Sequence, residues 1–411
     1  MSDFNQLYQD IESGNILPDQ IYNLDIDYPQ FFAIEHYKKY KHDTIDKIQK
    51  LHIVFLDIEV FSNFTGEFLP ENAISPISAC TIYSNFTKTF YAYFLLVSKN
   101  ANAINNSMLE NLKDQYKKEL LEEGYLKPDD EIELNLFINN EKDLLNSCWN
   151  KIKELDPVIY TGWNSSKYDI PYIYNRLKLL YDGDTTIVNN ILSKFGIVRN
   201  KYGEIQIVGM NGLDQMVLYK PRSELGLNYG STQASYSLDY ISEQELGINK
   251  VEYEGSLDRL FLDDPIKYFK YNIGDVALCA RLNEKLGHIE LHNMIRRDMK
   301  TPLSYSLRGS SAIFDTYVTY ELACSNKKVK WGVIDTINNK ITQQDINEFP
   351  QPINKKMKWT INSVDEAELR SKLFKFPGAY VKDINFKLIT PKDGINIDLD
   401  AASLYPLNRW M

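Results

Sequence analysis

The feature that most constrains this sequence is Leu51–Glu59 (LHIVFLDIE), a nearly continuous apolar run that ends in two carboxylates. A run that is apolar at successive positions is typical of a strand buried on both faces, in the middle of a sheet. Asp57 and Glu59 stand two positions apart, so their side chains leave the same face of that strand. The run therefore predicts a central strand that brings two acidic side chains to one place.

Patterns elsewhere in the chain predict strands alternating with helices, which is consistent with an α/β fold. Strands are expected over 77–82, 87–96, 158–161, 213–219 and 395–399, and a hairpin over 197–208. Helices are expected over 141–155, from about residue 169, and over 265–286, the last between Asp264 and Gly287. The charged stretch 105–133 is expected to be an excursion on the surface, and the polar stretch 325–371 a domain boundary or an insertion.

Composition limits the classes of protein that remain. The 411 residues suffice for two or three domains. Acidic residues (56) outnumber basic ones (46), and the net charge of −10 excludes a protein held to nucleic acid by bulk positive charge. A local basic groove stays open, as does a nuclease whose carboxylates hold metal ions. Four scattered cysteines are expected to be reduced thiols in the core: Cys80, Cys148, Cys279 and Cys324.

The N-terminus (MSDFNQLYQD) is acidic and lacks the apolar core of a secretory signal peptide. The longest apolar stretch, 90–97, is too short to cross a bilayer. These features predict a soluble intracellular protein of the cytoplasm, neither secreted nor associated with a membrane.

Two further segments place acidic side chains beside a regular element. In Tyr160–Ile173 (YTGWNSSKYDIPYI) a strand, a glycine turn and a helix start direct Asn164 and Asp169 toward a shared cleft. Asp169 could instead cap the helix, and Asn164 could simply form the turn. In Tyr271–Asp275 (YNIGD) the phenol and the carboxylate lie four positions apart on one helix face. An isolated pair of this kind is more often a core-edge tyrosine beside a solvated acid.

The three acidic segments are informative when they are taken together and in this order. Four carboxylates from distant segments form a donor set for hard divalent cations, and two such cations support phosphodiester hydrolysis. A phenol one helical turn from a carboxylate can orient the attacking water. The sequence has no G-x-x-x-x-G-K-[ST] phosphate loop, and no histidine fits the role of nucleophile or general base. These observations predict a two-metal phosphodiesterase.

The same segments resemble the Exo I, Exo II and Exo III motifs of the proofreading domain in family B DNA polymerases, especially the replicative polymerases of tailed phages. The most specific element is YTGWN…YDIPYIYNRLK, and the intervals between Asp57, Asp169 and Asp275 also agree. The resemblance implies an RNase H-like α/β domain with a mixed sheet, a 3′→5′ exonuclease, over 51–300. A partial N-terminal domain or arm over 1–50 would precede it.

The resemblance also implies roles for the site residues. Two divalent metal ions, Mg²⁺ or Mn²⁺, would be held by four carboxylates, the last of them supporting the second ion: Asp57, Glu59, Asp275 and Asp169. Tyr271 would position the attacking water, and Asn164 and Tyr168 would shape the site around the substrate. That substrate would be DNA, as a single-stranded 3′ end or a primer-template.

A second group of motifs extends the resemblance toward the C-terminus. Phe376–Val381 (FPGAYV) and Asp400–Pro406 (DAASLYP) resemble the start of the polymerase palm and its motif A. In that family the aspartate at the position of Asp400 binds the polymerase metal ions, and the tyrosine at the position of Tyr405 lies under the incoming sugar. The domains expected after the exonuclease are a connecting region and a truncated start of the palm: 301–375 and 376–411.

The sequence departs from the family pattern because the second polymerase aspartate segment, Y-G-D-T-D-S, is absent. We therefore expect no polymerase activity unless a second polypeptide supplies the rest of the palm, the fingers and the thumb. A split gene or a gene interrupted at motif A is favoured over a designed truncation. Two alternatives stay open: a non-catalytic half that lends scaffold and Asp400 to its partner, and a stand-alone RNA or oligonucleotide nuclease, which the palm-like segment disfavours.

Overall fold

The computed structural model describes residues 28–39, 50–201, 204–220 and 233–303, with 313–314, 316–318 and 320–321. All of them belong to one unit of the chain, Asn23–Lys328. Several predictions therefore lie outside the described residues, namely most of the N-terminal domain, the polar insertion, the strand over 395–399, Asp400 and Tyr405. The predicted domain boundaries stay predictions.

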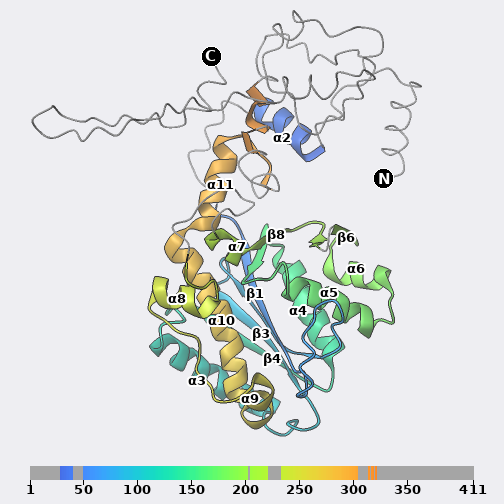
Figure 1. Cartoon of the computed structure of the whole chain (residues 1–411), viewed down its shortest axis with the longest axis vertical. Helices are drawn as coiled ribbons and strands as arrows, with labels where there is room; N and C mark the ends of the chain where they lie inside the picture. The colour runs from blue at the N-terminus through green and yellow to red at the C-terminus, as the bar shows by residue number, and fades with distance from the viewer. Residues whose placement is uncertain are drawn as a thin grey trace, which may run out of the picture. The chain divides into compact units, whose positions relative to one another are not determined.

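A six-stranded mixed sheet lies at the centre of the described residues (Figure 1). Its order is β4-β3-β2-β1-β5-β8. The strands are β1 (Ile53–Val60), β2 (Ile77–Ser84), β3 (Thr89–Leu96), β4 (Glu131–Ile138), β5 (Ile159–Gly162) and β8 (Asn211–Asp214). The strand β2 is antiparallel to β1 and β3, whereas the other neighbouring pairs are parallel. The expected α/β fold with a mixed sheet is confirmed, and the apolar run forms an inner strand, β1.

A separate two-stranded hairpin consists of β6 (Val198–Lys201) and β7 (Glu204–Ile207), paired antiparallel as the sequence predicts. The helices are α2 (Tyr28–Lys39), η2 (Asn106–Met108), α3 (Leu109–Glu122), α4 (Glu141–Leu155), α5 (Asp169–Leu180), α6 (Thr185–Leu192), α7 (Gln215–Tyr219), α8 (Leu238–Leu246), α9 (Leu257–Asp263), α10 (Pro265–Leu286) and α11 (His288–Asp298). No helix among the described residues is both long and apolar enough to cross a membrane.

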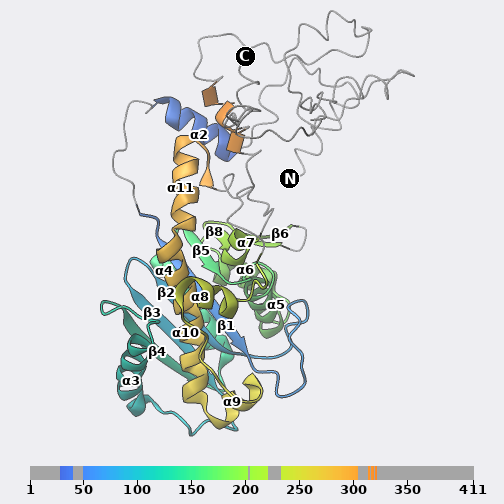
Figure 2. The ribbon, with the colours of Figure 1, turned by 60° about the vertical axis from the view of Figure 1, so that its left-hand side comes forward.

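Helices cover both faces of the sheet (Figures 1 and 2), with α3, α8 and α10 on one face and α4, α5 and α6 on the other. Alternate residues of β1 divide between the two resulting cores. Ile53 and Phe55 pack into the core that contains α10, whereas Val54 and Leu56 pack into the core that contains α4 and α5. Asp57 continues the Ile53–Phe55 series, so the acidic side chains of β1 point toward α10.

The helix α10 begins and ends where the sequence predicts. The Asp264 side chain accepts a hydrogen bond from the Lys267 N–H at 3.0 Å, Pro265 occupies the first turn, and Gly287 ends the helix with φ of 64°. Phe269 on this helix stacks on Phe94 of β3, with ring centroids 3.9 Å apart. These contacts fix the face of α10 that meets the sheet.

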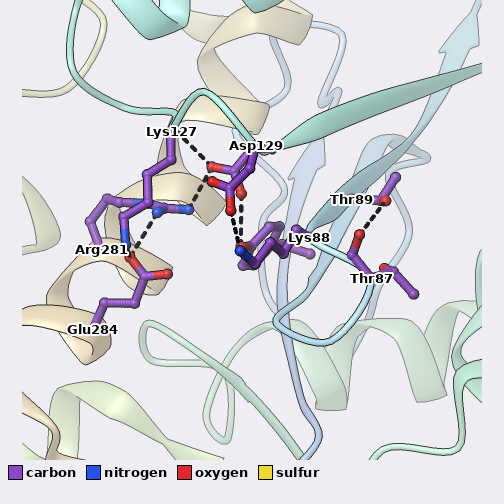
Figure 3. Close-up of polar contacts among 9 residues, drawn as sticks. Thr87, Lys88, Thr89, Lys127, Asp129, Arg281 and Glu284 are labelled. Carbon is purple, nitrogen blue, oxygen red and sulfur yellow. Dashed lines mark hydrogen bonds and ion pairs between the residues drawn. The ribbon is translucent and has the colours of Figure 1, made fainter.

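Charged side chains fix the C-terminal half of α10 to the edge of the sheet (Figure 3). Arg281 donates to Asp130 at 2.9 Å and to Glu284 at 2.7 Å, and both Arg281 and Asp130 are buried. On the neighbouring turn Lys88 pairs with Asp129. Loss of one partner from a buried pair leaves an uncompensated charge. The buried Arg281–Asp130 pair therefore opposes sliding of α10 along the sheet.

The prediction of a surface excursion over 105–133 is wrong in part. The helix α3 buries Leu112, Tyr116 and Leu120, and β4 extends the sheet by pairing with β3. Charged residues on the outer faces of these elements make the alternation of apolar residues hard to recognise. For example, the exposed Glu131 and Glu133 flank the buried Ile132. Composition was a poor guide here, because only one side of each element is buried.

The prediction of a strand over 213–219 is also wrong beyond its second residue. The strand β8 ends at Asp214, whose carboxylate accepts a hydrogen bond from the Met216 N–H at 3.0 Å and so caps α7. An apolar run of this length does not distinguish a buried strand from a short buried helix.

Three of the four cysteines lie in the described residues: Cys80, Cys148 and Cys279 are free and buried. The prediction of core positions is confirmed for these three, and Cys80 Sγ lies 3.0 Å from Cys148 Sγ. Their reduced state stays a prediction, and Cys324 lies outside the described residues.

Candidate metal centre

Three carboxylates meet where β1 faces α10. One oxygen from each of Asp57, Glu59 and Asp275 lies within 4.8 Å of the other two. The pairing of β1 with β2 shifts register directly after Glu59, which is the kind of irregularity that redirects side chains beside active sites. The fold thus brings together residues more than two hundred positions apart, and three of the four predicted carboxylates form one cluster.

The fourth carboxylate, Asp169, lies beside this cluster without being one of its three members. Its Oδ1 accepts a hydrogen bond from the Ile58 N–H at 3.1 Å, so it meets β1 between Asp57 and Glu59. The alternative role as a helix cap is not observed. Tyr168 holds the N-cap position of α5 without a side-chain capping bond. The first residue of α5 therefore delivers a buried acid to the central strand.

Burial makes the ionised forms of these acids unfavourable. It raises the pKa of Glu59 to about 8 and that of Asp169 to about 7. Burial also raises the pKa of Asp57, to which the charges of Asp169 and Glu59 add, and burial raises the pKa of Asp275. Asp57 and Glu59 are half-buried, whereas Asp169 and Asp275 are buried. Acids grouped in this way need nearby positive charge to stay ionised at neutral pH.

One positive charge reaches the cluster within the described residues, that of Lys250, and the sequence does not predict it. Lys250 Nζ donates to Asp275 Oδ2 at 2.5 Å and to the Tyr271 hydroxyl at 3.0 Å. Burial lowers the pKa of Lys250, but Asp275 and Tyr271 outweigh this and raise it well above its usual value. The segment 247–255 (GINKVEYEG) carries no spacing that indicates such a role. Only the tertiary fold reveals it.

Tyr271 and Asp275 share one face of α10, bridged by Lys250. Tyr271 is buried, and its ring meets the ring of Tyr253 edge-on, with centroids 5.5 Å apart and planes at 90°. The phenol is therefore held by a cation at its oxygen and by an aromatic ring at its side. This arrangement gives it one orientation beside the carboxylates.

Asn164 lies in the loop between β5 and α5, and Asp214 anchors that loop. Asp214 accepts hydrogen bonds from the Asn164 N–H at 2.9 Å and from the Ser166 hydroxyl at 2.8 Å. Asn164 adopts φ of 62°, a conformation that asparagine tolerates better than most residues. At Gly162 a Cβ would lie 2.4 Å from the Leu56 carbonyl oxygen, so the close approach of β5 to β1 requires glycine. Asp214, like Lys250, has a structural role at the site that the sequence does not predict.

The residues present fit a divalent cation. All the donors are carboxylate oxygens, which hard cations such as Mg²⁺ and Mn²⁺ prefer. Asp275 Oδ1 is buried and has no hydrogen-bond partner among the described residues. An orphaned carboxylate oxygen facing other acids is costly unless a cation accepts it as a ligand.

Comparison with known proteins agrees with this geometry. A family model for the exonuclease domain of family B DNA polymerases matches residues 9–241, more than half of the chain. The chain belongs to this family. The matched segment contains Asp57, Glu59 and Asp169, whereas Tyr271 and Asp275 follow it.

Individual relatives support the same assignment. The DNA-directed DNA polymerase of Escherichia phage RB69 is 33% identical over 253 residues, which cover 59% of this chain and 26% of the relative. That of Enterobacteria phage T4 is 29% identical over 264 residues, covering 60% and 27%. The DNA polymerase delta catalytic subunit of Plasmodium falciparum is 29% identical over 201 residues, covering 45% and 18%. The chain spans about a quarter or less of the length of these relatives. The predicted resemblance to the exonuclease domain of family B DNA polymerases is confirmed, whereas the resemblance to the start of the palm stays a prediction.

Proposed function

We propose that this chain is a metal-dependent 3′→5′ exodeoxyribonuclease that proofreads for a family B DNA polymerase. The observation that carries the proposal is the convergence of Asp57, Glu59 and Asp275 within 4.8 Å, in a chain of this family. Two divalent ions, Mg²⁺ or Mn²⁺, would be held by these three residues, with Asp169 supporting the second. When bound, such ions activate water and neutralise the oxygen that leaves the phosphate.

The chain's own groups would orient the reactants. The Tyr271 hydroxyl, held by Lys250, would fix the direction of the attacking water. Glu59 would serve as a metal ligand, and no side chain of the described residues donates a hydrogen bond to its carboxylate, which leaves both of its oxygens available to the ions. Asn164 and Tyr168 would border the nucleotide, on the loop that Asp214 anchors.

The substrate would be a single-stranded 3′ end or the frayed end of a primer-template. The loop after β1 exposes two aromatic side chains, Phe64 (58%) and Phe68 (42%). Asp258 of α9 holds this loop by accepting a hydrogen bond from the Phe64 N–H at 2.7 Å. Exposed aromatic rings on an anchored loop suit stacking on unpaired bases, which does not depend on sequence.

The relatives are named DNA polymerases, and we propose for this chain only a part in DNA polymerisation. Asp400 and Tyr405 would belong to a polymerase centre that needs a second aspartate segment, supplied together with the remaining palm, fingers and thumb, for example by a second polypeptide. The chain would act where its DNA is, which is the host cytoplasm if a phage encodes it.

A direct test uses the purified 411-residue chain, a 5′-labelled single strand and a duplex with a 3′ mismatch, in Mg²⁺ or EDTA. We expect a ladder that shortens from the 3′ end in Mg²⁺ only. Glu59→Gln should abolish it, whereas Glu133→Gln, a matched change at an exposed position on β4, should not. A folded chain that leaves both substrates intact contradicts the proposal and favours a structural contribution to a larger polymerase.

A further inference from the structure

Asn272 is a fully buried amide on α10, next to Tyr271 in the sequence. Its Nδ2 donates to Asp57 Oδ2 at 2.7 Å, across 215 positions of the chain. Its own Oδ1 has no hydrogen-bond partner among the described residues. Half of the amide is therefore buried without compensation.

An apolar side chain of similar size would suit this position better for folding alone. Burial of an unpaired amide oxygen costs free energy. Ile273 and Val276, nearby on the same helix, show which side chains it carries where only packing matters. The one contact that the amide makes is to a carboxylate of the candidate metal centre. Among the described residues no other group donates a hydrogen bond to the Asp57 carboxylate. The hydrogen bond to Asp57 therefore explains why an amide, with its unpaired buried oxygen, is found at this position.

Asp57 and Asp275 are held in different ways. Lys250, a cation, holds Asp275 and opposes a metal ion by its charge. Asn272 is neutral, so it fixes the orientation of Asp57 without reducing its negative charge. A neutral donor to one oxygen leaves the carboxylate fully available as a ligand.

We propose that Asn272 is a positioning residue, which holds the Asp57 carboxylate toward Glu59 and Asp275 and thereby sets the affinity of the centre for its divalent cation. This inference rests on the proposed function, since it assigns Asp57 as a metal ligand. Loss of a hydrogen bond that orients a metal ligand typically weakens metal binding by about 10- to 100-fold.

The test compares Asn272→Leu with a matched control, Asn283→Leu. Asn283 lies on the same helix, is also buried, and also donates its amide to a carboxylate, that of Glu290, at 3.2 Å and 3.3 Å. Binding of Mn²⁺ to the metal-free full chain is measured by calorimetry, and folding by urea denaturation. Exonuclease rate is then measured against Mn²⁺ concentration.

We expect Asn272→Leu to bind Mn²⁺ about 10- to 100-fold more weakly, with an unfolding midpoint close to that of the wild type. Its rate should recover as Mn²⁺ is raised, while Asn283→Leu should bind Mn²⁺ like the wild type. Wild-type affinity in Asn272→Leu overturns the positioning role and leaves the proposed function intact. If Asn272→Leu does not fold, Asn272→Ala is judged by the same comparison. A wild-type chain that binds no Mn²⁺ overturns the metal-dependent function, and this inference with it.

Discussion

The Asp169 carboxylate accepts a hydrogen bond from the Ile58 N–H across 111 positions, at 3.1 Å. Ile58 stands between Asp57 and Glu59, so this bond attaches the start of α5 to the acidic part of β1. Asp169 thus has two separable properties: it is an acceptor that ties two elements together, and it is a charge beside the cluster. Substitutions that remove one property at a time distinguish them.

Asp169→Asn keeps an acceptor oxygen for Ile58 and removes the charge. We expect it to fold with a free energy of unfolding within about 1 kcal/mol of the wild type and to lose roughly 10- to 100-fold in exonuclease rate. Asp169→Ala should lose a similar rate and also about 1–3 kcal/mol of stability, because the buried N–H is left unpaired. Urea denaturation and a single-strand degradation assay check both. Wild-type rate in Asp169→Asn would exclude a role for the charge.

Tyr271→Phe and Tyr268→Phe form a matched pair on α10. Each change deletes one buried hydroxyl, but that of Tyr268 is hydrogen-bonded to Ser78 Oγ at 2.6 Å, whereas that of Tyr271 accepts from Lys250. We expect Tyr271→Phe to lower the rate by roughly 100-fold and Tyr268→Phe to cost about 1 kcal/mol of stability with a nearly unchanged rate. Equal rates in the two variants would contradict the proposed orientation of water by Tyr271.

Without metal, the acidic cluster should make stability depend on pH. Burial raises the pKa of Glu59 to about 8, whereas an unfolded glutamate titrates near pH ~4.3. A raised native pKa gives stability that is fully present below the unfolded pKa and is lost as pH rises through about 8. In EDTA the thermal midpoint should therefore fall between pH 5 and pH 8.5, and less steeply in Glu59→Gln. Saturating Mn²⁺ should remove much of the fall, because the cation binds the ionised native state. A midpoint in EDTA that falls equally in Glu59→Gln would contradict this assignment.

The sequence predicts elements well where one periodicity dominates. The apolar run of β1 and the apolar stripes of α4 and α10 allow the bounds of these elements to be predicted. The strand β1 is buried along most of its length, and each helix is buried along a continuous face. The predictions from the sequence are wrong at β4 and α7. In β4 exposed glutamates alternate with apolar residues, so the segment reads as a charged surface stretch. The helix α7 has only five residues, too few for a helical period of apolar residues to be recognised.

The candidate site divides in the same way. Asp57, Glu59, Asp169, Tyr271 and Asp275 lie in segments with recognisable spacing, so the sequence alone could nominate them, although their roles stay predictions. Lys250, Asn272 and Asp214 act through contacts with residues 25, 215 and 50 positions away. No local pattern encodes such contacts, because they exist only once α10 and β8 have packed on the sheet.

Lys250 and a divalent cation compete for the same carboxylate. Lys250 Nζ lies 2.5 Å from Asp275 Oδ2, on a carboxylate that a metal ion would also use. Two like charges held about 4 Å apart repel by on the order of 1 kcal/mol or more. We expect Lys250→Met to bind Mn²⁺ roughly tenfold more tightly and yet to degrade DNA more slowly, because Tyr271 loses its donor. Lys270→Met is the control, since Lys270 lies on the same helix as Tyr271 and pairs with Glu119 and Glu123 instead. Weaker Mn²⁺ binding in Lys250→Met would mean that the lysine organises the site rather than competing with the cation.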